Sequence, residues 1–196
     1  RIRDDRAGHQ GVYCEQGGDT TITLFLNPTP RLSVSVTDTV WCDSSTVDIT
    51  VDDDLLGVRG SKVYELTTTY TPGAVEGVQL TDEYPAGTDI SNDLVNLTGE
   101  VQAVTYHFRA RIRNPRGDDP GYYCDQGRDT SITIYLNPTP RLSAEVVPEE
   151  TIFCDSSTVD ITVSDLTGNV FSENTKVYEL TTAYTAGAVE GLQPDG

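Results

Sequence analysis

Apolar and polar residues alternate over several short stretches, which is the pattern of a strand with one buried face. The alternation is clearest over residues 31–36, 46–51, 62–70, 101–113 and 131–136. Weaker patterns at 77–80 and 89–97 predict two further short strands, and no helical period extends beyond one or two turns. The inward positions of the clear stretches are Leu32, Val34, Val36, Val47, Ile49, Val51, Tyr64, Leu66, Val104, Tyr106, Phe108, Ala110, Ile112, Ile132, Ile134 and Leu136. Seven short strands between Gly, Pro and Asp turn signals predict an all-β fold, an antiparallel β-sandwich of immunoglobulin type.

A block of the sequence occurs twice. The tetrapeptide Asn27-Pro28-Thr29-Pro30 returns 110 residues later as Asn137-Pro138-Thr139-Pro140. Cys42 returns 112 residues later, and Lys62 returns 114 residues later. Each gain of two residues lies between the alternating stretches, where loops accept insertions at little cost. The sequence therefore predicts tandem modules of about 110 residues, with the two tetrapeptides as inter-module linkers.

The phase of the repeat divides the chain into three predicted parts. Residues 1–27 are the C-terminal strands of a preceding module, 28–137 are a complete module, and 138–196 are the N-terminal part of a following module. We expect this chain to be a window from a much longer polypeptide. We also expect its two incomplete modules to be completed by something outside the chain or by another copy of it.

The repeated module resembles a known family. The run from Asp93 to Tyr106 is followed by a strand, a cysteine-containing loop, a Thr-rich strand and the tetrapeptide linker. This order resembles the PKD-like immunoglobulin-fold repeats of giant bacterial surface proteins, and the segment from Cys42 to Val51 is similar to the way those repeats enter their second strand. The resemblance covers the whole chain and implies a stalk or fibre role in a very long adhesin on a bacterial cell surface.

Composition fits a water-facing, β-rich protein outside the cell. Apolar residues make up only 36% of the chain, and 13 basic residues against 31 acidic ones give a net charge of −18. Such a charge argues against nucleic acid as a partner, because phosphate backbones need Lys and Arg. It also keeps a long fibre soluble. No apolar run is long enough to span a bilayer.

The four cysteines, Cys14, Cys42, Cys124 and Cys154, recur in equivalent positions and are candidates for disulfides. One pairing joins Cys42 to Cys124 inside a module, provided that the long loop folds down the side of the sandwich. Another joins Cys42 to the loop cysteine of the following module, and a third, ranked last, joins Cys14 to Cys42 through a hairpin at the first linker. A strand spans about 20 Å whereas a disulfide needs Cα atoms within roughly 7 Å, so the pairing depends on where the loop lies. Reduced cysteines are the remaining alternative.

No catalytic set recurs in both copies. The only histidines are His9 and His107, and His9 aligns with Asp119, so we predict that the chain is not an enzyme. No EF-hand spacing is present either. The acidic residues that come closest to calcium ligands are Asp52, Asp53, Asp54, Asp82 and Asp89. We expect these to be solvated loops and predict no metal and no cofactor.

Two short motifs carry little weight alone. Arg116-Gly117-Asp118 occupies the loop in which fibronectin-type domains display a cell-binding tripeptide, but the other copy lacks it. Asn96-Leu97-Thr98 is a formal glycosylation sequon. We expect neither motif to define the function.

One strand carries a basic outward face. Its residues are His107, Arg109, Arg111 and Arg113, and Phe25 and Tyr135 are predicted to face outward nearby. Arg and aromatic residues favour interfaces. The stripe is therefore either a sheet face within one module or a lateral contact through which chains bundle.

These observations favour a non-enzymatic stalk or fibre segment of an extracellular adhesin, with neighbouring modules of the same chain, or copies in a fibre or bundle, as partners. The repetition supports this role because a spacer gains from every copy. The alternatives are a module whose loops bind carbohydrate or a target cell surface, and the non-catalytic part of a secreted enzyme.

Overall fold

The computed structural model describes residues 2–3, 6–8, 11–14, 17–53, 56–114, 121–147, 152–185 and 188–191. These residues form strands and loops, with no helix among them. The strands are β1 (Ile2–Arg3), β2 (Val12–Cys14), β3 (Ser33–Val36), β4 (Val40–Trp41), β5 (Ser45–Asp52), β6 (Ser61–Thr69), β7 (Val75–Glu76), β8 (Asp82–Pro85), β9 (Ile90–Asn96), β10 (Gln102–Arg113), β11 (Tyr122–Cys124), β12 (Asp129–Leu136), β13 (Leu142–Val147) and β14 (Asp160–Asp165).

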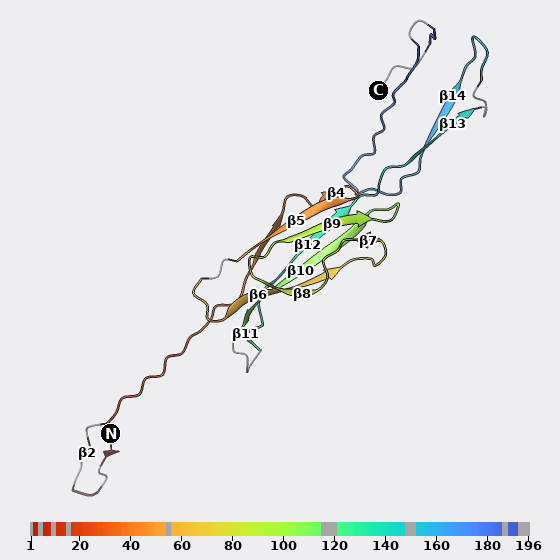
Figure 1. The fold of residues 1–196 in the computed structure, drawn as a ribbon. Coiled ribbons are helices and arrows are strands. Elements are labelled where there is room, and N and C mark those ends of the chain that lie inside the picture. The colour runs from red at the N-terminus through yellow and green to blue at the C-terminus, as the bar shows by residue number, and fades with distance from the viewer. Residues whose placement is uncertain are drawn as a thin grey trace.

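Strands β3 to β12 build a two-sheet sandwich in the middle of the chain (Figure 1). One sheet has the order β4-β12-β10-β6-β8, with β11 paired to the end of β10, and the other has the order β3-β5-β9-β7. All pairs are antiparallel except β4 with β12, which run parallel. The predicted all-β sandwich is confirmed.

The inward faces of the two sheets share one core. Alternation places Val47, Ile49 and Val51 of β5 inside, each no more than 1% exposed. The side chains of β10 from Val104 to Ile112 alternate in the same way. Tyr64 lies at the centre of the aromatic part of this core, with its ring 5.5 Å from that of Tyr84 and 5.7 Å from that of Phe108. The period of two read from the sequence therefore identifies the buried faces correctly.

Three details of the strand prediction are wrong between residues 73 and 85, the first being that the short strand β7 was not predicted. The predicted strand at 77–80 is absent, because Gly77 turns the chain with a φ of 79° directly after β7. A Cβ at Gly77 would lie 1.8 Å from the carbonyl oxygen of Asp93, so only glycine fits there. Strand β8 was not predicted, because its sequence Asp-Glu-Tyr-Pro does not alternate. It is an edge strand paired only with β6, where Pro85 is tolerated. The predicted strand at 89–97 is confirmed as β9.

The sequence repeat returns as a repeat of strand pairing. Strand β1 pairs with β2 in the register Ile2↔Cys14, and β10 pairs with β11 in the register Ile112↔Cys124, with a bulge at the same place. Strand β13 pairs with β14 through Ala144↔Val163, which corresponds to Val34↔Val51 between β3 and β5. Local structure therefore follows the repeat even outside the sandwich.

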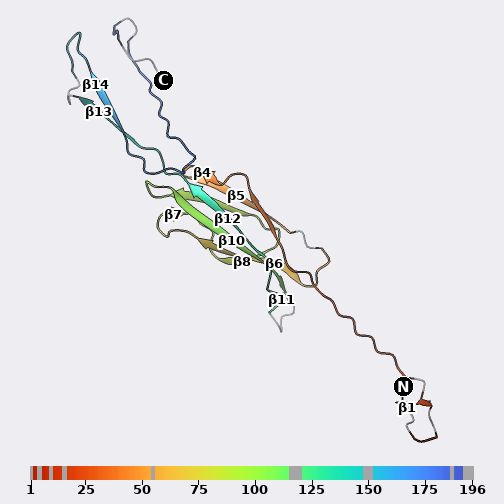
Figure 2. The same cartoon turned by 180° about the vertical axis from the view of Figure 1, so that it is seen from behind.

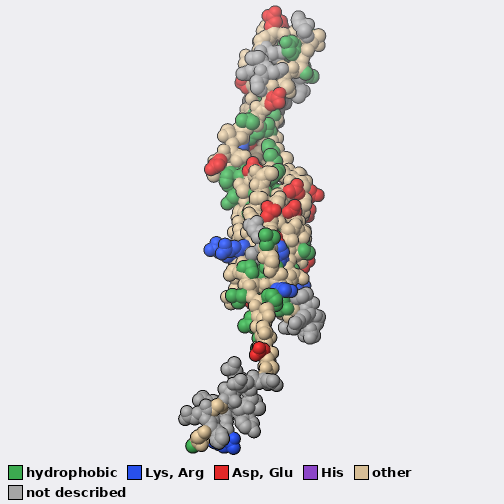
Figure 3. Space-filling view, turned by 90° about the vertical axis from the view of Figure 1, so that its left-hand side faces the viewer, with side chains coloured by type: hydrophobic (Ala, Val, Ile, Leu, Met, Phe, Trp, Pro, Cys, Tyr) green, Lys and Arg blue, Asp and Glu red, His purple; other side chains and the backbone are tan. Residues whose placement is uncertain are grey.

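The chain is elongated, with its two end parts on opposite sides of the sandwich (Figures 1 and 2). Residues 17–30 run as an extended segment from the sandwich towards β1 and β2 (Figure 1). Residues that are buried in the sandwich have exposed counterparts in these parts: Leu26 is 99% exposed where Leu136 is fully buried, and Ile161 is 62% exposed where Ile49 is fully buried. Hydrophobic side chains are accordingly visible on the surface at both ends of the sandwich (Figure 3).

Candidate functional site

The first linker is held by one asparagine and one loop residue of the sandwich. The side-chain oxygen of Asn27 accepts the backbone N–H of Arg59 at 2.8 Å, and its amide nitrogen donates to the carbonyl oxygen of Arg59 at 2.9 Å. The Arg59 guanidinium carbon lies 4.2 Å from the centre of the Phe25 ring, a cation–π contact. We call Phe25, Asn27 and Arg59 the first junction.

The second linker is held in the same way. The side-chain oxygen of Asn137 accepts the backbone N–H of Phe171 at 2.7 Å. The rings of Tyr135 and Phe171 lie 4.6 Å apart at an interplanar angle of 41°. We call Tyr135, Asn137 and Phe171 the second junction.

The two junctions occupy equivalent positions of the repeat. Phe25 and Asn27 correspond to Tyr135 and Asn137 at an offset of 110, and Arg59 corresponds to Phe171 at the offset of 112 that also relates Cys42 to Cys154. In both junctions the side-chain oxygen of an asparagine accepts a hydrogen bond from a backbone N–H. The aromatic ring two residues before the asparagine contacts the side chain of the residue that donates this hydrogen bond. Each junction thus combines a hydrogen bond from a backbone N–H to an asparagine with a contact of an aromatic ring.

The second junction has a further anchor in Asp43. This carboxylate accepts a hydrogen bond from the hydroxyl of Thr139 and another, at 2.7 Å, from the backbone N–H of Asn96. Partial burial alone would raise the pKa of Asp43, but these hydrogen bonds and those from Ser44 favour the charged form and hold the pKa below its ordinary value. Asp43 is therefore a charged link between the sandwich and the linker.

A loop of the following part, around Asn169, also forms hydrogen bonds with the sandwich at this end. The backbone N–H of Val101 donates to the carbonyl of Asn169 at 3.0 Å, and the N–H of Asn169 donates to a carboxylate oxygen of Glu100 at 2.8 Å. A Cβ at Gly168 would lie 2.1 Å from the carbonyl oxygen of Gly99. Because the backbones approach this closely, a residue larger than glycine at 168 would separate the two parts.

The cysteines lie near the linkers. Cys42 lines a pocket with the second linker, while Cys124 lines one with the first linker. Cys124 is paired with Ile112, near one end of β10. Trp41, the residue before Cys42, is paired with Leu136, which is itself paired with Gln102 at the other end of β10. Ten residues of β10 separate these two points, about 33 Å, so the long loop does not fold down the sandwich to join Cys42 and Cys124.

The arrangement also lacks the hairpin that would bring Cys14 near Cys42. The linker at 27–30 continues an extended segment and forms no hairpin tip; β2 lies at the far end of that segment, and β4 lies at the opposite end of the sandwich (Figure 1). Cys42, Cys124 and Cys154 are free in the described part of the chain.

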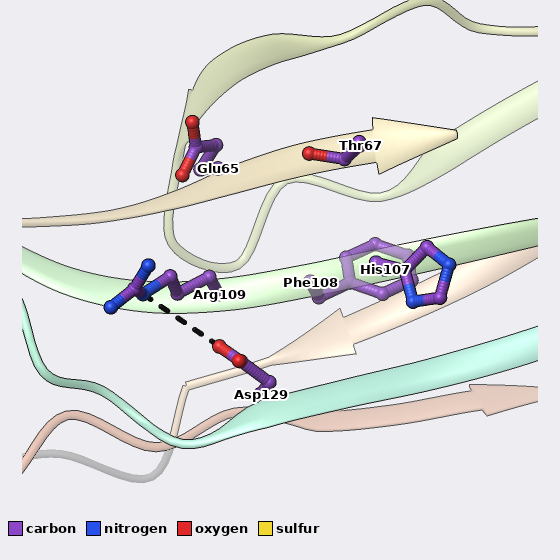
Figure 4. A pocket seen from close by; sticks show the side chains of 6 residues that line it. All are labelled: Glu65, Thr67, His107, Phe108, Arg109 and Asp129. Atoms are coloured by element: carbon purple, nitrogen blue, oxygen red, sulfur yellow. Dashed lines mark ion pairs between the residues drawn. The ribbon is translucent and has the colours of Figure 1, made fainter. Parts of the chain in front are cut away.

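The basic stripe on β10 is neutralised within its own sheet. Arg111 lies 2.6 Å from Glu65 of β6, Arg113 lies 2.8 Å from Glu83 of β8, and Arg109 lies 3.7 Å from Asp129 of β12. A shallow pocket of about 320 Å³ lies between these strands, with His107 on its rim (Figure 4).

Phe25 and Tyr135 do not join this stripe. They lie at the two junctions, and Phe25 is outside any strand. The aromatic rings of the possible lateral interface thus contact Arg59 and Phe171, whereas its arginines pair with acidic residues of their own sheet.

The acidic candidates have structural uses. Asp53 forms an ion pair with Lys62, Asp89 accepts the backbone N–H of Val51 at 2.9 Å, and Asp82 accepts that of Glu83 at 2.8 Å. Asp52 ends β5, and Asp54 lies outside the described residues. No group of three or more potential ligands converges in the part of the chain that the structure describes.

The short motifs have different outcomes. Arg116-Gly117-Asp118 and His9 lie outside the described residues. Asn96 is only 5% exposed, and its amide nitrogen donates to the carbonyl oxygens of Glu100 and Leu136. A glycan on Asn96 is therefore incompatible with this fold. No helix in the described ranges is long and apolar enough to cross a membrane.

Sequence reasoning marked the two tetrapeptides as linkers but did not predict the residues that hydrogen-bond to their asparagines. Arg59 and Phe171 differ in side chain, and both lie in loops with no periodic pattern. Both residues contribute a backbone N–H, a group that almost every residue type has, so the sequence does not reveal it. Comparison with models of known families gives no match to the chain, and comparison with curated proteins finds no significant relative.

Proposed function

We propose that the chain is a structural repeat of a stalk or fibre, part of a very long extracellular adhesin on a bacterial surface, built of immunoglobulin-like modules of the PKD type. The observation that carries the proposal is the recurrence of one junction geometry at both ends of the sandwich. A spacer needs each module to hold the next at a set orientation, and a repeated clamp supplies this.

The strand order supports the module type. The sheet β3-β5-β9-β7 faces the sheet β4-β12-β10-β6-β8, which fits the immunoglobulin arrangement of an A-B-E-D sheet against a G-F-C sheet. In such a sandwich the chain enters at one end and leaves at the other, so consecutive modules extend in line. The position of residues 17–30 and of β13 and β14 on opposite sides of the sandwich agrees with this direction (Figure 1).

Charge supports an exposed, in-line array. The net charge of −18 disfavours collapse of a long chain onto itself. The arginines of β10 already have acidic partners in the same sheet, so they contribute little unpaired charge to side-by-side bundling. We propose end-to-end contact between modules as the main association.

Length measurement tests this role. Chains in which residues 28–137 are present in increasing numbers of consecutive copies are compared by small-angle X-ray scattering. A spacer with clamped junctions gains a constant increment in maximum dimension for every copy. Growth close to the square root of copy number, as for freely jointed units, would contradict it. Binding of the single-copy chain to a panel of glycans would instead favour the alternative of a ligand-binding module.

A further inference from the structure

A pocket lies at the second junction, at the place that corresponds to the surface against which loop 121–128 lies at the first junction. The pocket has a volume of about 310 Å³ and is lined by Cys42 and Asp43 of the sandwich, by the linker 137–140 and by residues 174–178. Cys42 is exposed at its edge. The lining thus combines the end of one part of the chain, the linker, and the beginning of the next part.

At the first junction the corresponding surface lies against loop 121–128, which contains the sequence Tyr-Tyr-Cys. Residues 174–178 correspond to 60–64 at the offset of 114, and a Cβ at Gly60 would lie 3.0 Å from the ring of Tyr123. The linker 27–30 lines a pocket together with Tyr123, Cys124 and Asp125, and the N–H of Arg128 donates to the carbonyl of Pro30 at 3.1 Å. The loop 121–128 therefore lies against a linker and a strand start of the same kind as those that line the pocket at Cys42.

We propose that the pocket beside Cys42 receives the Tyr-Tyr-Cys loop of another copy of the module, and that Cys42 forms a disulfide with that loop's counterpart of Cys124. The inference rests on the proposed tandem arrangement, because the loop comes from the module that follows the second linker. It is the pairing across one junction, while the separation of about 33 Å along β10 disfavours pairing within a module.

The chemistry is a thiol–disulfide exchange. The Cys42 thiolate attacks one sulfur of a mixed disulfide on the loop cysteine, the new S–S bond forms, and the other thiolate leaves with the electron pair of the broken bond. Starting from two thiols, an added small-molecule disulfide accepts the two electrons, and its two halves leave as thiols with the two protons. The product is a covalent staple across the Asn-Pro-Thr-Pro linker.

A peptide capture experiment tests the proposal on the full chain. The probe is a peptide of the sequence 121–128 whose cysteine is activated as a 2-thiopyridyl mixed disulfide. Cys154 is the matched control, because it is exposed and residues 154–158 repeat the sequence Cys-Asp-Ser-Ser-Thr of residues 42–46, but it does not line the pocket at the second linker. Capture sites are quantified by mass spectrometry, and each rate is divided by that of the same cysteine with a small aromatic disulfide.

Docking raises the local concentration of the peptide, so we expect the normalised capture rate at Cys42 to exceed that at Cys154 by roughly tenfold. A peptide with Ser in place of both tyrosines is expected to lose this preference. Equal normalised rates at the two cysteines, or a preference that the Ser-substituted peptide retains, would overturn the proposal.

The experiment separates this inference from the proposed function. Linear growth of length with copy number, together with no preference for Cys42, would keep the spacer and reject the staple. Selective capture at Cys42 without linear growth would keep the loop-binding pocket and reject the clamped spacer.

Discussion

The side-chain oxygen of Asn137 accepts the backbone N–H of Phe171 at 2.7 Å, while the Phe171 ring lies against Tyr135. One amide group therefore connects the last strand of the sandwich to a loop of the next part of the chain. Asn27 and Arg59 repeat this relationship at the other end. The proposed spacer role therefore depends on the two junctions, where each part of the chain contacts the next.

Replacement of Asn137 by Ala is expected to loosen the second junction alone. Asn137 is only 8% exposed, and a hydrogen bond of this kind contributes about 1 kcal/mol. Hydrogen exchange at the Phe171 amide should therefore quicken by roughly fivefold. The Arg59 amide at the first junction is the internal control and should keep its wild-type rate. Unchanged exchange at Phe171 would show that Asn137 does not hold the junction.

The link through Asp43 is expected to depend on pH. Its folded-state pKa is lowered, so its stabilisation is complete above the unfolded pKa of about 3.9 and is lost as pH falls below this value through the folded pKa. Urea unfolding of the wild type and of Asp43→Asn measures the effect. The stability advantage of the wild type should be present at about pH 7 and largely gone at about pH 2. An advantage of equal size at both pH values would contradict this assignment.

Two buried tyrosines are expected to respond oppositely to loss of their hydroxyl groups. Tyr64 and Tyr106 are both fully buried, and burial raises the pKa of each, so both stay neutral. The Tyr64 hydroxyl donates to the carbonyl of Thr88 at 2.5 Å, whereas that of Tyr106 has no hydrogen-bond partner in the described structure. Tyr64→Phe should therefore cost about 1 kcal/mol, and Tyr106→Phe should be neutral or stabilising by up to about 1 kcal/mol. Chemical denaturation measures both, and equal losses would refute the difference.

Gly77 is expected to tolerate no side chain. Gly77→Ala places a methyl group against the Asp93 carbonyl and should destabilise the sandwich by more than about 3 kcal/mol. Gly73→Ala is the matched control, since Gly73 also has a positive φ but open space around its Cβ position. Only the backbone strain, about 1 kcal/mol, applies there. Thermal unfolding of the two variants should separate the clash from the strain, and similar losses would contradict the close approach at Gly77.

The sequence was sufficient to predict the sandwich faces because burial on one side of a strand imposes a period of two. It located Val47, Ile49 and Val51 correctly for this reason. It failed at β8, because an edge strand with one partner needs little hydrophobic patterning. It placed Phe25 and Tyr135 near the basic stripe as a possible lateral interface, and it carried no signal for their contacts with Arg59 and Phe171.

The candidate site was predictable only in part. The repeated tetrapeptide marked both linkers, and the recurring lysine had a structural reason: Lys62 pairs with Asp53, and Lys176 pairs with Asp165 at 2.7 Å. Arg59 and Phe171 were not predicted, because donating a backbone N–H does not require a particular side chain. The position of loop 121–128 was not predicted either. It depends on the pairing of β11 with the end of β10, and that pairing has no clear signal in the alternation of apolar and polar residues.

The use of a main-chain donor at each junction has a consequence for how such an array changes over time. Arg59 and Phe171 both donate a backbone N–H to an asparagine, so this contact does not depend on the side chain at that position. In the proposed array, adding or removing a module would therefore leave a backbone N–H available to the asparagine at each new boundary. The reach of the proposed stalk would thus change in steps of one module, with the same kind of hydrogen bond at each boundary.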